Sequence, residues 1–163
     1  MVGAILVQST NWYNAEAAIQ DLIVGLALRQ SNFELYGLFL QNGRSGVTDP
    51  AYENLREQGK TLLTPASLQA LPTEELGLLI YSSRFYQQKA ERLKNLSQWL
   101  IDRFGGETEN ISVDDWPLLR EELLALNGIG EETADLILNY PLNQPVFVVD
   151  EYAKRAFIQR GLI

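Results

Sequence analysis

The sequence contains no cysteine and no histidine. Without cysteine there can be no disulfide bond, no thiolate nucleophile and no iron–sulfur cluster held by this chain. Without histidine the chain lacks a common zinc ligand, the commonest general base and every Ser-His or Cys-His catalytic arrangement. Any catalytic chemistry would have to come from carboxylates, lysine, tyrosine or the backbone.

Long apolar runs are also missing. The longest candidates, such as residues 22–28 (LIVGLAL), are much shorter than the roughly 18 residues of a membrane helix, and they fit a buried helix instead. Met1 is followed directly by VGAILV with no basic residue, so we expect neither a signal peptide nor a membrane partner.

Positive charge is scarce. The 13 Lys and Arg against 21 Asp and Glu give a net charge of −8, which argues against nucleic-acid binding because phosphate contacts favour a basic surface. The cations that are present are clustered at Arg84, Lys89, Arg92 and Lys94, and again at Lys154, Arg155 and Arg160. The simplest interpretation of the cluster from Lys89 to Lys94 is a solvated helix face.

Almost all of the chain is predicted to be helical, so the expected fold class is all-α, a bundle of short helices. The 163 residues suffice for one sizeable core. The expected helix starts are residues 1–7, caps at Asn14 and Ser31, and the pairs Asp49-Pro50, Thr64-Pro65 and Pro72-Thr73. Gly59 is expected just beyond the end of one helix, and the clearest helical pattern covers residues 85–104, followed by Gly105-Gly106.

Two amphipathic segments near the C-terminal end are joined by a very short connection. Residues 116–126 and 131–140 flank Asn127-Gly128-Ile129-Gly130, so two helices must turn sharply there. A glycine permits a positive φ, the apolar Ile129 can plug the core beneath the turn, and the second helix begins with N–H groups that suit a phosphate. This is the helix-hairpin-helix pattern, which grips DNA through backbone amides without reading sequence. The alternative is an ordinary αα-hairpin.

An apolar segment, VFVVD, follows the hairpin and ends at Asp150, where a new helix (EYAKRAFIQR) is expected. Asp150 is interpreted first as the N-cap of that helix. Backbone N–H groups at a helix start favour an ionised carboxylate, which is suited to facing a developing positive charge.

These motifs together resemble the helix-hairpin-helix DNA glycosylase superfamily, the endonuclease III group. LNGIGEETADLILN followed by VFVVD is similar to the hairpin and catalytic aspartate of that group, residues 3–12 are similar to its gap-filling segment, and residues 84–100 to its Y-x-x-K-A segment. Within the group, the resemblance is greatest to the cluster-free 3-methyladenine DNA glycosylases. It implies an endonuclease III-like DNA glycosylase fold, with the hairpin (116–140) closing a six-helix-type domain over 1–140.

The resemblance also implies that the chain is truncated at both ends, with residues 141–163 beginning a second, incomplete helical domain. Residues 28–60 do not match the family pattern. The implied function is base-excision repair of damaged double-stranded DNA: a monofunctional N-glycosylase that hydrolyses the glycosidic bond of an alkylated purine of the 3-methyladenine type. The implied location is the cytoplasm, in association with the nucleoid.

Roles for individual residues follow from the resemblance alone. Asp150 would be the catalytic carboxylate, and Glu132 would face the base pocket at the position where bifunctional members have the lysine that forms a Schiff base. The residues expected at the DNA are Gln8, Phe85, Lys89, Gly128, Gly130 and Thr133. Carbonyls of Leu124, Leu126 and Ile129 would hold a monovalent cation, Na⁺ or K⁺, and no other cofactor is expected.

Each role has a purely structural alternative. Glu132 could be a surface residue in a helix first turn, Gln8 a helix C-cap and Phe85 a core side chain, while Trp12, Trp99 and Trp116 are expected in the core. At the level of function, the alternatives are a non-catalytic DNA-binding module, an inactive truncated homologue and a protein-interaction bundle.

Overall fold

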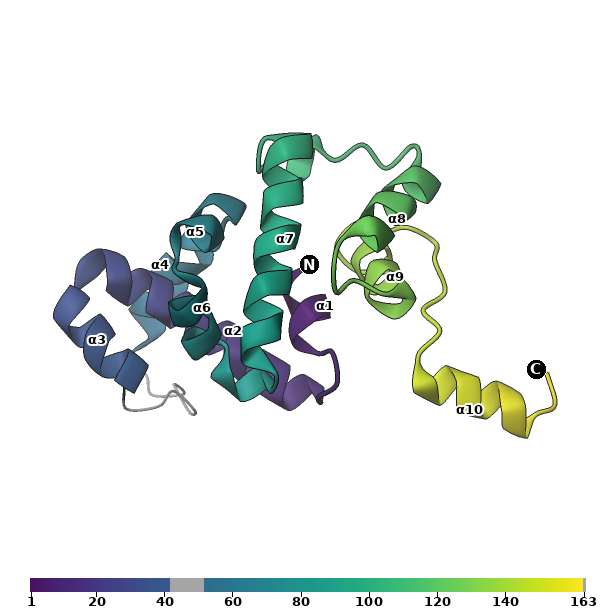
Figure 1. Ribbon diagram of the computed structural model, residues 1–163, viewed down its shortest axis with the longest axis horizontal. Helices are drawn as coiled ribbons and strands as arrows, with labels where there is room; N and C mark the ends of the chain where they lie inside the picture. The colour runs from purple at the N-terminus through teal and green to yellow at the C-terminus, as the bar shows by residue number, and fades with distance from the viewer. Residues whose placement is uncertain (42–51, 163) are drawn as a thin grey trace. The chain divides into compact units, whose positions relative to one another are not determined.

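A computed structural model describes residues 1–41 and 52–162, and every regular element in those two ranges is a helix (Figure 1). The prediction of an all-α chain is confirmed for this part of the molecule. The chain forms two compact units, Val2–Ile111 and Ser112–Ile163. The domain boundary expected at residue 140 differs from this division and stays a prediction.

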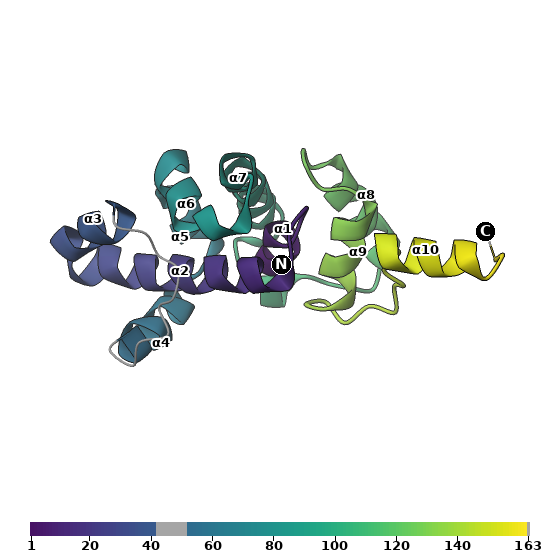
Figure 2. The ribbon, with the colours of Figure 1, turned by 90° about the horizontal axis from the view of Figure 1, so that it is seen from below.

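The unit Val2–Ile111 is built around one long helix, α2 (Trp12–Ser31), whose middle is almost entirely buried. The other elements are α1 (Val2–Leu6), α3 (Phe33–Gln41), α4 (Glu53–Leu62), α5 (Pro65–Ala70), α6 (Thr73–Leu79), the 3₁₀ turn η2 (Tyr81–Ser83), α7 (Tyr86–Phe104) and the 3₁₀ turn η3 (Thr108–Asn110). In Figure 2, α4 and α6 lie on opposite sides of α2. Fully buried leucines, among them Leu22, Leu76 and Leu93, form the core between these helices.

Two of the expected helix caps are wrong by a few residues. Helix α2 begins after Asn11, whose Oδ1 accepts a hydrogen bond of 2.9 Å from the backbone N–H of Asn14, so Asn11 and not Asn14 is the cap. Helix α3 is capped by Asn32, which accepts from the backbone N–H of Leu35 at 3.0 Å, whereas Ser31 still belongs to α2. In both cases two or more capping residues lie within one turn, and the sequence does not distinguish them.

Other expected boundaries agree with the structure. Thr64 caps α5 in a reciprocal capping box with Ser67, and Gly105 ends α7 with a left-handed φ of 68°. Helix α7 matches the predicted 85–104 except that Phe85 is its N-cap. The expected start at Asp49-Pro50 lies outside the described residues.

Gly59 is not beyond the end of a helix but inside α4, where it is buried against α2. A Cβ atom at this position would lie 1.9 Å from the carbonyl oxygen of Ile23. Only glycine fits here, because the backbones of α4 and α2 are in contact. In the sequence alone, a glycine placed for this reason looks the same as one that ends a helix.

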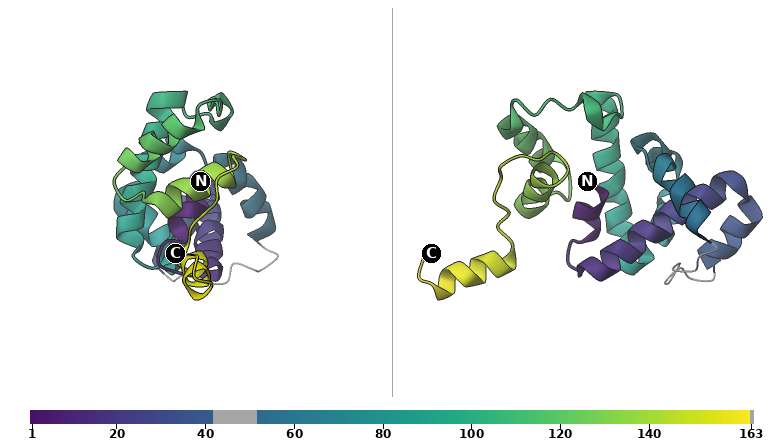
Figure 3. Two further views of the ribbon diagram at one scale, coloured as in Figure 1. Left: turned by 90° about the vertical axis from the view of Figure 1, so that its right-hand side faces the viewer. Right: turned by 180° about the vertical axis from the view of Figure 1, so that it is seen from behind.

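The unit Ser112–Ile163 contains α8 (Trp116–Ala125), α9 (Glu131–Asn139) and α10 (Glu151–Gln159). Helices α8 and α9 pack side by side, which can be followed from the front and from behind (Figures 1 and 3). Residues 143–150 form a connection to α10 without regular secondary structure. No helix in the described ranges has both the length and the apolarity needed to cross a membrane.

Replacing Gly59 and Gly37 by alanine should change stability in opposite directions. Gly59→Ala should lower the free energy of unfolding by about 2–3 kcal/mol, because the new methyl group forces two backbones apart. Gly37→Ala should raise it by about 0.5–1 kcal/mol, because Gly37 is in the interior of α3 with open space around its Cβ position. Urea unfolding of both variants measures the difference, and equal effects would contradict the close approach of α4 to α2.

Candidate functional site

The turn between α8 and α9 is built on Gly128, which has a φ of +86°, in the left-handed region that favours glycine. Ile129 follows with only 5% of its surface exposed, and its backbone N–H donates to the carbonyl of Leu126 at 3.1 Å. Gly130 then adopts an extended conformation as the residue before α9. The expected arrangement of a glycine turn above an apolar plug is therefore present.

The first turn of α9 suits an anion. Gly130 has no side chain with which to cap the helix, and the space where its Cβ would lie is open. Backbone N–H groups at such a helix start point outward and attract negative charge. Glu132 is exposed in this turn, whereas Thr133 is 6% exposed and belongs largely to the hairpin interior.

The expected cation site consists of backbone oxygens at the end of α8. Leu126 leaves the helical conformation (φ −76°, ψ 130°), which turns its carbonyl away from the helix axis. That carbonyl accepts the hydrogen bond from Ile129, and a carbonyl oxygen has a second lone pair. The geometry at Leu126 is compatible with the monovalent cation expected with Leu124 and Ile129. No cluster of three or more acidic side chains suited to a metal occurs among the described residues.

A partly buried ion pair, not predicted from the sequence, joins the two hairpin helices. Arg120 on α8 donates from Nε and Nη2 to the two carboxylate oxygens of Asp135 on α9, at 2.6 and 3.2 Å. Asp135 is 6% exposed, so its charge depends on this partner. The sequence does contain a signal, because the opposite charges lie at nearly equal separations on either side of Gly128.

Asp150 is the N-cap of α10, as expected from its position. Its Oδ1 accepts a hydrogen bond of 2.7 Å from the backbone N–H of Ala153, and the residue is half-buried. The connection leading to it is anchored on α9 by Asn139, whose amide donates to the carbonyl of Val146 at 2.6 Å. Asn139 was not identified from the sequence, since an asparagine at a helix end is expected to cap only its own helix.

The structure brings the first turns of α9 and α10 into electrostatic contact. The pKa of Lys154, one turn after Asp150, is raised mainly by its hydrogen bond with Glu151 and further by the charges of Glu132 and Glu131. Glu132, in the first turn of α9, therefore acts on a lysine in the first turn of α10, the helix that Asp150 caps.

Gln8 and Phe85 lie on turns of the other unit, Val2–Ile111. Gln8 follows α1, and its Oε1 accepts a hydrogen bond from Nη1 of Arg92 on α7. Phe85 is 56% exposed in a left-handed conformation (φ 45°), and the guanidinium of Arg84 lies over its ring at 5.8 Å. The interpretation of Phe85 as a core residue is wrong, because its backbone directs the ring to solvent.

Lys89 is not on a solvated face. It is completely buried, and its Nζ donates to the carbonyls of Leu6 and Ser83 at 2.8 and 2.5 Å. Lys94 is half-buried, with its ammonium bonded to the carbonyls of Gln69 and Leu71. The prediction that Lys89 contacts DNA directly is therefore corrected, because its ammonium group is bonded to the protein's own backbone.

One tryptophan is also placed differently from the expectation. Trp12, in the first turn of α2, is 58% exposed, and its neighbour Tyr13 is 79% exposed. Trp99 and Trp116 are half-buried, and Trp99 packs edge-on against Phe104. The core assignment therefore fails for Trp12, which lies at the end of α2 that follows the Gln8 turn.

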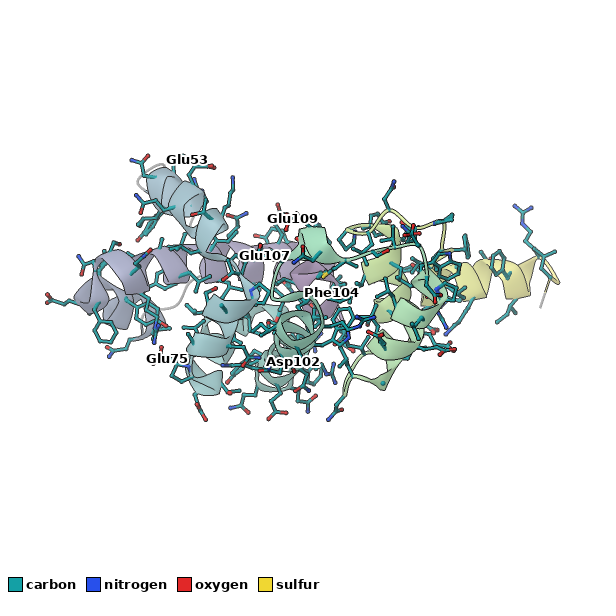
Figure 4. All side chains as sticks on the ribbon, turned by 90° about the horizontal axis from the view of Figure 1, so that it is seen from above. Glu53, Glu75, Asp102, Phe104, Glu107 and Glu109 are labelled. Atoms are coloured by element: carbon teal, nitrogen blue, oxygen red, sulfur yellow. The ribbon has the colours of Figure 1, made fainter. Side chains whose placement is uncertain are left out.

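Several acidic side chains are exposed on the unit Val2–Ile111. Glu53, Asp102, Glu107 and Glu109, labelled in Figure 4, are all exposed. Since two of the lysines are occupied internally, the positive charge left on the surface is smaller than the composition suggests. The other two lysines, Lys60 and Lys154, are exposed and each is paired with a glutamate.

Comparison with known proteins gives consistent matches. The family model described as "HhH-GPD superfamily base excision DNA repair protein" matches residues 37–163. A protein of Methanocaldococcus jannaschii, named provisionally as a DNA repair glycosylase, is 36% identical over the whole chain, which spans 59% of its length. Endonuclease III of Thermotoga maritima is 35% identical over 68% of this chain and 50% of the relative.

Among solved structures, the H. pylori 3-methyladenine DNA glycosylase bound to 1,N6-ethenoadenine superposes with a TM-score of 0.65 at 26% identity, covering 99% of this chain and 60% of that one. A non-covalent endonuclease III–DNA complex gives a TM-score of 0.52 at 30% identity, over 68% of this chain and 50% of that one. The chain therefore spans between half and three-fifths of the length of these relatives.

Removing Arg120 should open the hairpin. Arg120→Ala leaves the Asp135 carboxylate buried without its partner, and we expect it to lower the free energy of unfolding by roughly 3 kcal/mol. Glu121→Ala, an exposed change on the same helix, should stay within about 0.5 kcal/mol of the wild type. Denaturant unfolding measures both, and equal stability of the two variants would contradict the role of the ion pair.

Burial should make Lys89 a source of pH-dependent stability. Removal from water, reinforced by the charges of Arg92 and Arg84, lowers the pKa of Lys89 from 10.5 to about 8. Since the unfolded chain then binds more protons, stability should increase as the pH rises above 8 toward 10.5. Between about pH 7 and pH 9.5 the gain should be on the order of 2 kcal/mol. Urea titrations at several pH values should show this gain in the wild type and its absence in Lys89→Met.

Proposed function

The chain belongs to the HhH-GPD superfamily of base excision DNA repair proteins, and from this premise we propose that it acts as a DNA N-glycosylase. The observation that carries the proposal is the combination, within one compact unit, of a glycine turn that presents helix-start amides and a carboxylate fixed at the start of α10. The partner would be duplex DNA of the nucleoid that contains a damaged base.

The hairpin would hold the DNA backbone. The amides around Gly128 and Gly130 would be the donors for one phosphate, and Thr133 lies in the first turn of α9, whose dipole would face it. A cation on the carbonyls of Leu124, Leu126 and Ile129 would add positive charge beside the same phosphate. This mode of binding needs no lysine at the contact, which fits a chain with a net charge of −8.

Asp150 would supply the catalytic charge. As the bond between the base and the anomeric carbon breaks, its electron pair leaves with the base and the sugar becomes oxocarbenium-like. A carboxylate held in place beforehand stabilises that positive charge without having to reorganise. Water then adds to the anomeric carbon and loses a proton, which completes the hydrolysis.

Gln8 and Phe85 would occupy the space left when the damaged nucleotide is turned out of the stack. Exposure of the Phe85 ring supports this assignment, because a wedge has to reach beyond the protein surface. Trp12 and Tyr13, which follow the Gln8 turn, offer further exposed rings for contacts with bases.

The substrate we propose is an alkylated purine of the 3-methyladenine type. A base that is already cationic leaves without strong acid assistance, which suits a chain without histidine. The match to a 3-methyladenine DNA glycosylase over 99% of this chain supports the same choice. Glu132 would attract a positive base, and because it has no amine to form a Schiff base, we propose hydrolysis without strand cleavage.

Asp150→Asn separates the catalytic role from the structural one. Asparagine caps a helix about as well as aspartate, so α10 should be retained while the negative charge is lost. We expect release of 3-methyladenine from a methylated duplex to fall by at least about 100-fold. The measurement is excised base per enzyme under single-turnover conditions, across a panel of lesions.

Asp115→Asn is the matched control, because Asp115 is also an aspartate N-cap in the same unit, on α8. It should leave the excision rate within about twofold of the wild type. Base release that is equal in both variants would refute the assignment of Asp150. Salt-dependent duplex binding without any base release by the wild type would identify a non-catalytic DNA-binding module instead.

A further inference from the structure

One buried ammonium group connects two turns that are far apart in the sequence. Lys89 projects from α7, and its Nζ donates to the carbonyl of Leu6 at 2.8 Å and to that of Ser83 at 2.5 Å. None of its surface is exposed. The two acceptors belong to the end of α1 and to the end of η2.

Each acceptor lies two residues before one of the side chains proposed to enter the DNA. Leu6 precedes Gln8, and Ser83 precedes Phe85. The bonds from Lys89 therefore fix the backbone at the base of both turns. The separation between the two turns is set by how far one ammonium group can reach.

Both turns contain residues that need such support. Ser9, Arg84 and Phe85 have φ values of 53°, 62° and 45°, in the left-handed region that side-chain-bearing residues rarely occupy. Conformations of this kind persist where the surrounding structure enforces them, and they are concentrated at ligand-binding segments. In this unit, hydrogen bonds from α7 reach the backbone of both turns, beside the packing of α2 on α1 and η2.

A second residue of α7 reaches the same turn. Arg92, one helical turn after Lys89, donates to the side-chain oxygen of Gln8. Lys89 thus positions the backbone of the Gln8 turn, and Arg92 orients its side chain.

Burial of the ammonium group opposes its charge, which the lowered pKa of Lys89 reflects. A methionine would fill similar space without that cost. The two hydrogen bonds therefore have a role that packing alone does not supply.

We propose that Lys89 is a positioning residue that sets the spacing of Gln8 and Phe85, so that both side chains fit the gap left by a flipped nucleotide. The inference rests on the proposed function and extends it to a residue that cannot itself touch DNA. Lys89 would thereby determine how well the protein distinguishes a duplex with a missing base from an intact one.

Lys94 provides a matched control on the same helix. Its ammonium is likewise bonded to two carbonyls, those of Gln69 and Leu71 at the end of α5, and it is bonded to neither turn. Lys94→Met removes the same kind of interaction without releasing Gln8 or Phe85.

The experiment measures Kd by fluorescence anisotropy for two duplexes of one sequence, one intact and one with a tetrahydrofuran abasic analogue. The wild type should prefer the abasic duplex. Lys89→Met should reduce this preference, the ratio of the two Kd values, by at least fivefold while changing the Kd for intact duplex by less than twofold. Lys94→Met should retain the wild-type ratio. Circular dichroism at the assay temperature establishes that each variant is folded.

A double variant that lacks both side chains tests whether Lys89 acts through Gln8 and Phe85. In Gln8→Ala/Phe85→Ala the preference should already be low, and adding Lys89→Met should reduce it no further. If Lys89→Met does not fold, Lys89→Gln replaces it, because an amide keeps donor groups on a shorter stem and should give an intermediate ratio.

Three results would overturn the inference. A wild-type preference that survives Lys89→Met, or survives Lys89→Gln unchanged if that variant has to be used, would refute the positioning role alone. An equal loss in Lys89→Met and Lys94→Met would show a general effect of destabilisation. Equal wild-type affinity for the two duplexes would refute the gap-filling function itself, and with it the role of Lys89.

Discussion

The positive φ at Gly128 is the constraint on which the C-terminal unit depends. It lets two helices reverse direction within four residues, which places Ile129 beneath the turn and the amides of α9 above it. The ion pair between Arg120 and Asp135 then closes the hairpin away from the turn. Because the connection to α10 is bonded back onto α9 through Asn139, the position of Asp150 also depends on the hairpin.

Two of the lysines are engaged by the protein's own backbone, which leaves the surface more acidic than the composition suggests. Lys89 and Lys94 neutralise the ends of short helices and turns, where carbonyl oxygens would otherwise lack partners. Arg120 and Arg92 are engaged with Asp135 and Gln8. Under the proposed function, phosphate would be bound by backbone dipoles, which add no net charge.

Local patterns predicted much of this structure. The hairpin, the long helix α7 and the Thr64 capping box follow from residue spacing and turn chemistry, which act within a few residues. The predictions from sequence were wrong where contacts between distant segments determine the environment of a residue. Gly59 resembled a helix end because the approach of α2 is not visible in the sequence, and Lys89 resembled a surface residue because its acceptors are in α1 and η2. The exposed ring of Phe85 likewise depends on a backbone conformation that its residue type does not favour.

The acceptors of Lys89 and Lys94 are main-chain oxygens. These hydrogen bonds therefore depend on the side chain of the donor but not on the side chain of the acceptor residue. Exchanging the side chain of Leu6, Ser83 or Gln69 leaves the acceptor atom in place, since every residue type carries the same carbonyl. Only the donor positions are restricted to one chemistry. The two turns can therefore differ in side-chain composition while Lys89, which bonds to the backbone of both, still connects them.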